Sequence, residues 1–244
     1  MSYLKRRLKL WLVGPEYEFH ADYYLRNNAR RLEHLASLGI PIHGRSVLEL
    51  GAGIGDHTHF YLDRGCKITT TEVREKNLQL LRRRYKRSGD AVTVRRLDLD
   101  NPDDSLPQFD LVHCYGLLYH LSEPARALAF IGRHCLGQLV METVVSCGDE
   151  SALNVVREHD YSPSQSFHGN GCRPTRRWVV DELKRHFDYV YIPKTQPNHI
   201  EFPLDWRDPA TSKLPLARSI FVASKTPLNN PLLGENIPDR QEYH

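Results

Sequence analysis

The segment from Ser46 to Gly55 constrains the fold of this chain more than any other part of it. It reads Ser-Val-Leu-Glu-Leu-Gly-Ala-Gly-Ile-Gly, an apolar run that ends in three alternating glycines. Because glycine permits backbone conformations that a Cβ forbids, the run predicts a buried strand that stops in a tight turn and opens a helix. The first N–H groups of that helix would face a ligand that approaches the turn.

An acidic residue follows where a second strand should end. The run that closes with Thr71 and Glu72 is β-rich, and a carboxylate at the tip of the second strand can accept hydrogen bonds from ribose hydroxyls. The glycine spacing differs from the Gly-x-Gly-x-x-Gly of dinucleotide sites, and Asp56 would repel a pyrophosphate. The pattern favours a nucleoside cofactor without phosphate. A structural turn that binds no ligand is the alternative.

Strand-like and helix-like runs alternate along the rest of the chain. Ser122 before Pro124 and Thr175 mark two helix starts, because Ser and Thr cap helices and proline suits the first turn. The alternation predicts a parallel sheet with right-handed crossovers, which binds ligands at the carboxyl ends of its strands. The further strands are predicted at residues 92–97, 109–114, 137–145, 188–192 and 218–224.

The glycine run and the acids that follow it resemble the motifs of class I S-adenosylmethionine-dependent methyltransferases. The resemblance implies an α/β, Rossmann-like fold: a seven-stranded, mostly parallel sheet with helices on both faces and an antiparallel last strand. It also implies S-adenosylmethionine as the cofactor, with the acid after the third strand facing the adenine amino group. The cofactor residues expected from it are Glu49, Gly51, Ala52, Gly53, Gly55, Glu72, Val73, Asp98, Leu99, Tyr115 and Gly116.

A weaker resemblance covers residues 45–225. The motifs Gly116-Leu-Leu-Tyr119-His120, Glu142-Thr-Val-Val and Arg218-Ser-Ile-Phe are similar to those of transferases that modify the wobble uridine of tRNA. Those enzymes use S-adenosylmethionine or its carboxylated derivative, and the resemblance places Tyr119 and Arg218 at the extra carboxylate. Structural roles for both are the alternative. The predicted substrate residues are Tyr119, Arg173, Asp205 and Arg218.

The length of 244 residues suits one enzyme domain. N-terminal helices over residues 1–40 are predicted to cover the cofactor site, and a tail over residues 226–244 is predicted to follow the methyltransferase domain at 41–225. A lid helix is expected within the N-terminal part, where Arg26 could bind the cofactor carboxylate or be solvated surface charge. The polar, glycine-bearing segment 162–174 is predicted to be a substrate loop.

Three further features narrow the class of protein. The net charge of +3 neither demands nor excludes nucleic acid. Five cysteines without a Cys-x-x-Cys pair indicate reduced thiols and a cytoplasmic location, and no apolar run is long enough to span a membrane. No His/Cys cluster has zinc spacing, so no metal is expected. The basic run Lys5-Arg6-Arg7 predicts either a helix that packs on the domain or one that touches a membrane surface or RNA.

A methyl group on a sulfonium is already activated, so the protein mainly has to align a nucleophile with it. A hydroxyl acceptor also benefits from a general base. His120 is the first candidate, because it follows the fourth strand and its ordinary pKa suits neutral pH. His168 and Glu142 are the other catalytic candidates. For His120 the alternative is a role in capping or packing.

These features lead to one main hypothesis and two alternatives. The main hypothesis is a methyltransferase that O-methylates a small molecule or a glycan. The first alternative is an RNA-modifying transferase, with the basic runs at residues 82–84, 95–96 and 173–177 as a phosphate footprint. The second is a cofactor-binding partner protein without catalysis.

Overall fold

The computed structural model describes residues 9–10, 12–208 and 210–244. The basic run Lys5-Arg6-Arg7, for which a helix is predicted, lies outside the described residues. In the part that is described, the N-terminal segment includes the short helix α2 (Glu16–Phe19) and the long helix α3 (Asp22–Ser37).

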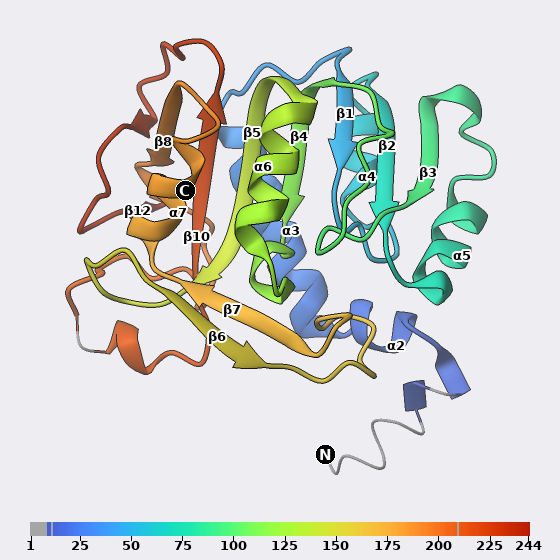
Figure 1. Cartoon of the computed structure of the whole chain (residues 1–244), viewed down its shortest axis with the longest axis horizontal. Coiled ribbons are helices and arrows are strands. Elements are labelled where there is room, and N and C mark those ends of the chain that lie inside the picture. The colour runs from blue at the N-terminus through green and yellow to red at the C-terminus, as the bar shows by residue number, and fades with distance from the viewer. Residues whose placement is uncertain (1–8, 11, 209) are drawn as a thin grey trace.

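The central sheet of the described chain has eight strands in the order β11-β8-β10-β5-β4-β1-β2-β3 (Figure 1). Strands β1 to β5 run parallel, and β10 is antiparallel to both β5 and β8. The prediction of a mostly parallel sheet with an antiparallel last strand is confirmed, and the short edge strand β11 is added to the seven that were predicted. The bounds are β1 Ser46–Glu49, β2 Lys67–Glu72, β3 Val92–Arg96, β4 Phe109–Tyr115, β5 Cys135–Val145, β8 Tyr189–Pro193, β10 Ala217–Ser224 and β11 Leu233–Gly234.

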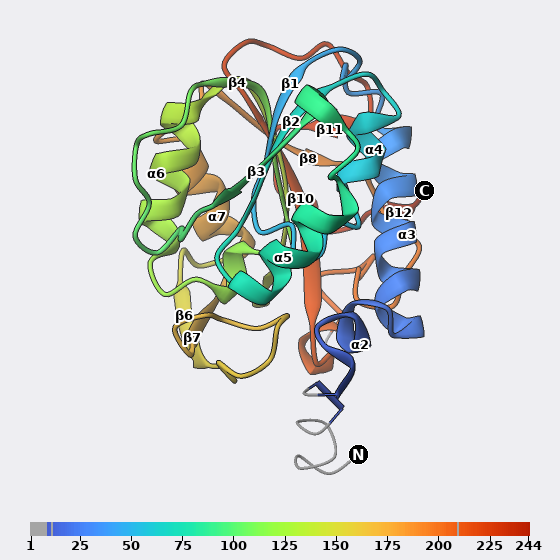
Figure 2. The same ribbon diagram turned by 90° about the vertical axis from the view of Figure 1, so that its right-hand side faces the viewer.

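Helices cover both faces of this sheet. Figure 2 shows α6 (Pro124–His134) and α7 (Arg176–Leu183) on one face and α3 with α4 (Thr58–Leu62) on the other, while α5 (Glu75–Arg84) packs on β2 and β3. Successive strand residues point to opposite faces, so adjacent side chains enter different cores. Leu48, Val112, Leu139 and Phe221 join the core under α6 and α7, whereas Val47, Leu111, Val140 and Ile220 join the one under α3.

The two predicted helix starts have different outcomes. Thr175 is the N-cap of α7, where its Oγ1 accepts a hydrogen bond from the backbone N–H of Trp178. The Ser122 cap is wrong. Helix α6 begins one residue later with Pro124 in its first turn, and the backbone N–H of Glu123 donates to Asp100 instead. A carboxylate from another loop therefore takes over the role of the local hydroxyl.

The end of the predicted substrate loop, residues 170–174, is a strand of a β-hairpin, whereas residues 162–169 are irregular. Strands β6 (Leu153–Arg157) and β7 (Asn170–Pro174) pair antiparallel and lie beyond the carboxyl ends of the parallel strands (Figure 1). Residues 170–174 were predicted as loop, but they are a strand because β6 supplies a pairing partner. Residues 158–169, which connect β6 to β7, form an irregular loop. This connection is called the hairpin loop below.

The remaining short elements organise the connections and the C-terminal segment. Strand β11 pairs with β8, and β12 pairs with β9, so the chain after residue 226 lies against the edge of the fold. These elements are β9 Thr195–Gln196, β12 Glu242–Tyr243 and the single 3₁₀ turns η1 Gly89–Ala91, η2 Leu118–His120 and η3 Thr211–Lys213.

The glycine turn after β1 needs its glycines for two reasons. Gly51, Gly53 and Gly55 have φ values of +63°, +58° and +86°, which L side chains rarely adopt. A Cβ on Gly55 would also lie 2.6 Å from Leu81 of α5 and 2.7 Å from Tyr85, the residue that follows this helix. The turn is therefore packed from outside as well as conformationally restricted.

Replacement of Gly55 by Ala should therefore destabilise the protein more than a matched substitution does. Gly89→Ala is the control, because Gly89 has φ +55° but nothing within 4 Å of its notional Cβ. Both variants carry the left-handed backbone cost of about 1–2 kcal/mol, and only Gly55→Ala adds overpacking of about 1–3 kcal/mol. Urea unfolding of both variants measures the difference, and equal losses would contradict the packing argument.

Candidate cofactor and active site

A cleft opens at the carboxyl ends of β1, β2, β3 and β4, as expected for an open α/β sheet. It contains about 680 Å³ of empty space, which includes open solvent at its mouth. We call it the outer cleft. It is lined by eight of the predicted site residues: Gly51, Gly53, Glu72, Val73, Asp98, Leu99, Gly116 and His120.

Glu72 organises the floor of the outer cleft. Its Oε2 accepts the N–H of Gly53 at 3.0 Å, and its Oε1 accepts those of Val73 and Arg74 at 2.8 and 2.9 Å. A carboxylate has about four acceptor sites, so one remains for a ligand hydroxyl. Burial nevertheless raises the pKa of the Glu72 carboxyl above its ordinary value, against the effect of these N–H donors.

A second, smaller hollow lies beside the glycine turn and shares Phe19, Tyr24 and Gly51 with the outer cleft. We call it the inner pocket. Its wall contains five buried polar atoms that have no hydrogen-bond partner among the described residues. Because buried polar atoms are normally paired, this set points to a polar ligand. The atoms are Arg31 Nε, Glu49 Oε1, Asp56 Oδ2, His57 Nε2 and Tyr115 Oη.

The charge states in the inner pocket are set by burial. Burial raises the pKa of the Glu49 carboxyl to about 7, even though Oε2 accepts a hydrogen bond from Thr58. Burial also lowers the pKa of His57 to about 3, so this ring is neutral at pH 7. Its Nδ1 lies 3.1 Å from Nε2 of His113, whose Nδ1 lies 2.8 Å from the hydroxyl of Tyr61. The predicted residues Glu49, Ala52 and Tyr115 all line this pocket.

The structure brings Arg31, and not Arg26, to these pockets. Arg26 lies on the exposed side of α3 and forms an ion pair with Asp22. Arg31 is 4% exposed, lines the inner pocket and lies beside Gly116. The signal that sequence reasoning missed is helical phase, since Arg31 shares its face of α3 with the buried Leu35.

Glu142 belongs to a buried network of ion pairs instead of the cleft wall. Its Oε1 lies 2.9 Å from Nη1 of Arg218, and its Oε2 lies 3.0 Å from Nη2 of Arg31. Arg218 also donates through Nε to Glu201 at 2.6 Å and through Nη2 to the hydroxyl of Tyr119 at 3.2 Å. Both carboxylate oxygens of Glu142 are therefore engaged by guanidinium groups of other elements. This arrangement gives Glu142 a structural role.

The other catalytic and substrate candidates are spread over the mouth and the rim. His120 lines the outer cleft and forms a hydrogen bond through Nδ1 to Glu158. His168 lies on the hairpin loop, 2.9 Å from Asp98. Arg173 pairs with Glu158. Asp205 is in a separate loop, where it pairs with Arg240, and does not join the site.

One set of side chains could in principle hold a cation. Asp98, Asp100 and His168 place possible ligand atoms within 4.8 Å of one another. Asp98 already accepts the His168 ring N–H and Asp100 accepts the N–H of Glu123. These pairs account for the cluster through hydrogen bonding, so we assign no metal to it.

The roof of the outer cleft is built from α2 and the hairpin loop. Arg74 donates to the carbonyl oxygens of Asp160, Gln165 and Ser166 in the hairpin loop. Glu18 of α2 accepts hydrogen bonds from Ser162 and Ser164 of the same loop. Next to Glu18, Phe19 lies so close to the glycine turn that a Cβ on Gly53 would be 2.8 Å from its ring. The N-terminal segment and the hairpin loop thus close over one space.

Comparisons with known proteins agree with this geometry. Residues 48–136 match the family model described as a methyltransferase domain. The chain is similar to a solved structure of the N-terminal domain of EvdMO1 in the presence of SAH and D-fucose, with a TM-score of 0.62, 22% identity and 84% of each chain covered. That likeness confirms the Rossmann-like fold.

Two kinds of curated relative are similar in sequence. The tRNA U34 carboxymethyltransferase of Vibrio atlanticus (strain LGP32) is 28% identical over 179 residues, 69% of this chain and 54% of that protein. The ubiquinone biosynthesis O-methyltransferase of Bordetella avium (strain 197N) is 30% identical over 111 residues, 45% of each. The chain spans about half the length of the curated relatives it matches. In the described residues no helix has the length and apolar character to cross a membrane.

The pKa of Glu49 predicts a specific pH dependence of stability. The ordinary pKa of 4.5 rises to about 7 in the folded protein, so the folded state binds this proton more tightly. The contribution of Glu49 is complete below about pH 4.5 and is lost as the pH rises to 7. The Glu49→Gln variant lacks this titration. The difference between its free energy of unfolding and that of the wild type (variant minus wild type) should therefore increase by roughly 2–3 kcal/mol from pH 4.5 to pH 7.5. Urea unfolding at both pH values tests this, and a constant difference would contradict it.

Proposed function

We propose that this chain, which carries a methyltransferase domain of the S-adenosylmethionine-dependent class, methylates a hydroxyl group of a small molecule or a glycan. The observation that carries the proposal is the pair of connected pockets at the glycine turn. One is lined by Glu72, Asp98 and Leu99, and the other contains unpartnered atoms of both an arginine and a glutamate. S-adenosylmethionine has a nucleoside at one end and an amino acid zwitterion at the other.

The outer cleft suits the adenosine end of this cofactor. Glu72 has one acceptor site left for a ribose hydroxyl, and Asp98 and Leu99 lie where the adenine would be. The inner pocket suits the amino acid end, with Arg31 toward the carboxylate and Glu49 toward the ammonium. Phe19 and Tyr24 line both spaces.

The ion-pair network favours methyl transfer over carboxymethyl transfer. Each of the three guanidinium nitrogens of Arg218 has a partner, namely Glu142, Glu201 or the hydroxyl of Tyr119. Arg31 pairs with the other oxygen of Glu142. Glu142 and Glu201 thus neutralise Arg218, which leaves it little positive charge for a carboxylate on the transferred group.

The charged surface favours a small acceptor over RNA. Arg173 pairs with Glu158, and Arg176 is buried against Trp206 and donates to the carbonyl oxygen of Pro238. The groove outside the mouth shares Tyr24 and Ser164 with the outer cleft. It is lined by Glu16 and Glu18 and by three tyrosines, Tyr17, Tyr23 and Tyr24.

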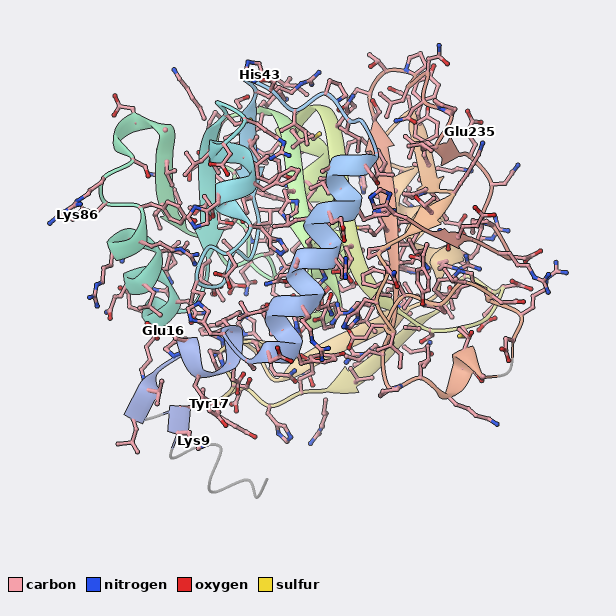
Figure 3. The ribbon with its side chains drawn as sticks, turned by 180° about the vertical axis from the view of Figure 1, so that it is seen from behind. Lys9, Glu16, Tyr17, His43, Lys86 and Glu235 are labelled. Carbon is pink, nitrogen blue, oxygen red and sulfur yellow. The ribbon has the colours of Figure 1, made fainter. Side chains whose placement is uncertain are left out.

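Two basic side chains of the run at residues 82–84 are neutralised. Arg82 and Arg84 form ion pairs with Glu75 and Asp56. Figure 3 shows Lys86 at the outer edge of the molecule, whereas Glu16 lies on α2. An acidic, aromatic mouth repels a polyanion and accepts an uncharged organic molecule. All five cysteines are free, which supports the cytoplasmic location included in this proposal.

Substitution of Arg31 should weaken the binding of the amino acid end of the cofactor and leave the binding of the nucleoside end unchanged. In Arg31→Gln, the affinity for S-adenosylhomocysteine should fall about 10- to 100-fold, because a charge-assisted hydrogen bond contributes roughly 1.5–3 kcal/mol. The affinity for 5′-methylthioadenosine, which lacks the amino acid end, should change little. Calorimetric titration of both ligands measures this.

Arg26→Gln is the matched control, since Arg26 is on the same helix but exposed. It should bind both ligands as wild type does. If Arg31→Gln lost affinity equally for the two ligands while its thermal midpoint stayed unchanged, this would contradict the assignment of the inner pocket to the amino acid end.

The activity itself is tested by supplying methyl-labelled S-adenosylmethionine and a fractionated cell extract. Label should enter the small-molecule or glycan fraction. Label in the tRNA fraction, released by ribonuclease, would instead establish the RNA-modifying alternative. Tight binding of S-adenosylhomocysteine with no transfer to any fraction would favour the partner protein without catalysis.

A further inference from the structure

Glu158 is a buried carboxylate that sequence analysis left without a role. It begins the hairpin loop, and its side chain is 3% exposed. One oxygen bonds Nδ1 of His120 and accepts the N–H of Ser166 at 2.9 Å, while the other lies 3.1 Å from Nη2 of Arg173. Partners on three sides hold the carboxylate in one position.

The environment keeps this pair in the form of a neutral imidazole and an anionic carboxylate. Burial lowers the pKa of His120 below its ordinary value, against the opposing effect of Glu158, and Arg218 and Arg173 lower it further. Burial favours a protonated Glu158, but the hydrogen bond from His120 and the charges around it hold the pKa of this carboxyl below its ordinary value. His120 is therefore free to accept a proton at neutral pH.

The ring nitrogen that could accept it is Nε2. A carboxylate only accepts hydrogen bonds, so Nδ1 of His120 must carry the proton in the neutral ring. His120 lines the outer cleft. The described part of the chain provides no hydrogen-bond partner for Nε2, which leaves its lone pair available to a molecule in the cleft.

A glycine allows the hairpin to come this close. A Cβ on Gly171 of β7 would lie 2.5 Å from the carbonyl oxygen of Tyr119 and 3.1 Å from the side chain of Glu158. Any larger residue would push the hairpin away from η2. The close packing of β7 on η2 thus brings a carboxylate from one element to a histidine of another.

We propose that Glu158 is a positioning residue that aims Nε2 of His120 at the acceptor, and that the acceptor atom is the oxygen of an alcohol or phenol. This rests on the proposed methyl transfer. The hydroxyl oxygen forms a bond to the methyl carbon as the carbon–sulfur bond breaks, and the neutral thioether leaves with the bonding electron pair. The hydroxyl proton moves to Nε2 of His120, and the imidazolium that results is stabilised by Glu158 before it releases the proton to water.

This arrangement is specific for oxygen for a chemical reason. A neutral amine attacks through its lone pair and can lose its proton afterwards, so it gains little from a histidine held in one tautomer. A hydroxyl becomes much more nucleophilic as its proton leaves, and a positioned base contributes about 10²–10⁴-fold. The Glu158–His120 pair supplies a base of that kind.

The first test needs no acceptor. Spectra of ¹⁵N-histidine-labelled protein, with and without S-adenosylhomocysteine, report the tautomer of each ring, and the His120 signals are identified by their loss in His120→Asn. The expected result is a proton on Nδ1 and an unprotonated Nε2 at pH 7.5. A proton on Nε2 would overturn the proposal, even if the Glu158 variants fail to fold.

The second test compares Glu158→Gln with Glu75→Gln, a control on the exposed face of α5. The acceptor is the extract fraction that takes up label from S-adenosylmethionine. In Glu158→Gln the plateau of the single-turnover rate should fall at least about tenfold, part of what a general base contributes. The acid limb of its pH profile should move to lower pH, because the carboxylate that raises the pKa of His120 is gone. The control should behave as wild type.

Each result separates this inference from the proposed function. An unchanged plateau and acid limb in Glu158→Gln, with S-adenosylhomocysteine still bound, would overturn the positioning role. A product labelled on nitrogen or carbon would overturn both the base role of His120 and the hydroxyl acceptor of the proposed function, and would leave only methyl transfer itself intact. Failure of the wild-type protein to bind S-adenosylhomocysteine would instead count against the proposed function.

Discussion

Four buried charges hold the N-terminal helix on the end of the sheet where both pockets open. Arg31 of α3, Glu142 of β5, Arg218 of β10 and Glu201 of the loop before it form one chain of ion pairs. Buried ions are costly unless they are paired and hydrogen-bonded, and loss of one partner leaves another uncompensated. Helix α3 can therefore sit in only one position, and that position brings Arg31 into the inner pocket.

The position of α3 also determines how the site is roofed. The helix carries Tyr24, and Phe19 precedes it, so both aromatic rings are held over the glycine turn. The hairpin loop completes the roof through hydrogen bonds to Glu18 and Arg74. These contacts are mostly polar, whereas the sheet below is held by two apolar cores. Regions with few buried apolar contacts open at lower free energy than a core, which suits a site that must admit a cofactor.

The local predictions succeeded where one short segment contains its own determinants. The glycine turn, the strands at 67–72 and 109–115 and the Thr175 cap depend on residues within a few positions. The Ser122 cap failed because Asp100, from another loop, bonds the helix start instead. The strand at 170–174 was missed because it needs β6 as its partner.

The site residues show the same difference between local and long-range determinants. Residues of the glycine turn and of the strand ends, with the exception of Gly55, line the outer cleft or the inner pocket, since parallel strands end at one edge. The choice between Arg26 and Arg31, the neutralisation of Arg218 and the pairing of His120 with Glu158 could not be read from single motifs. Tyr23 and Glu201 bond across 178 positions, and Arg218 and Tyr119 across 99.

The amino-acid sequence by itself determined the main strands of the central sheet, the glycine turn and the edge at which the candidate site lies, because two-residue alternation and glycine conformations act over short range. The tertiary structure alone decided which charges face the ligand and which are cancelled. The physical reason is that the charge state and orientation of a buried side chain depend on its neighbours in space, and here these come from distant parts of the chain.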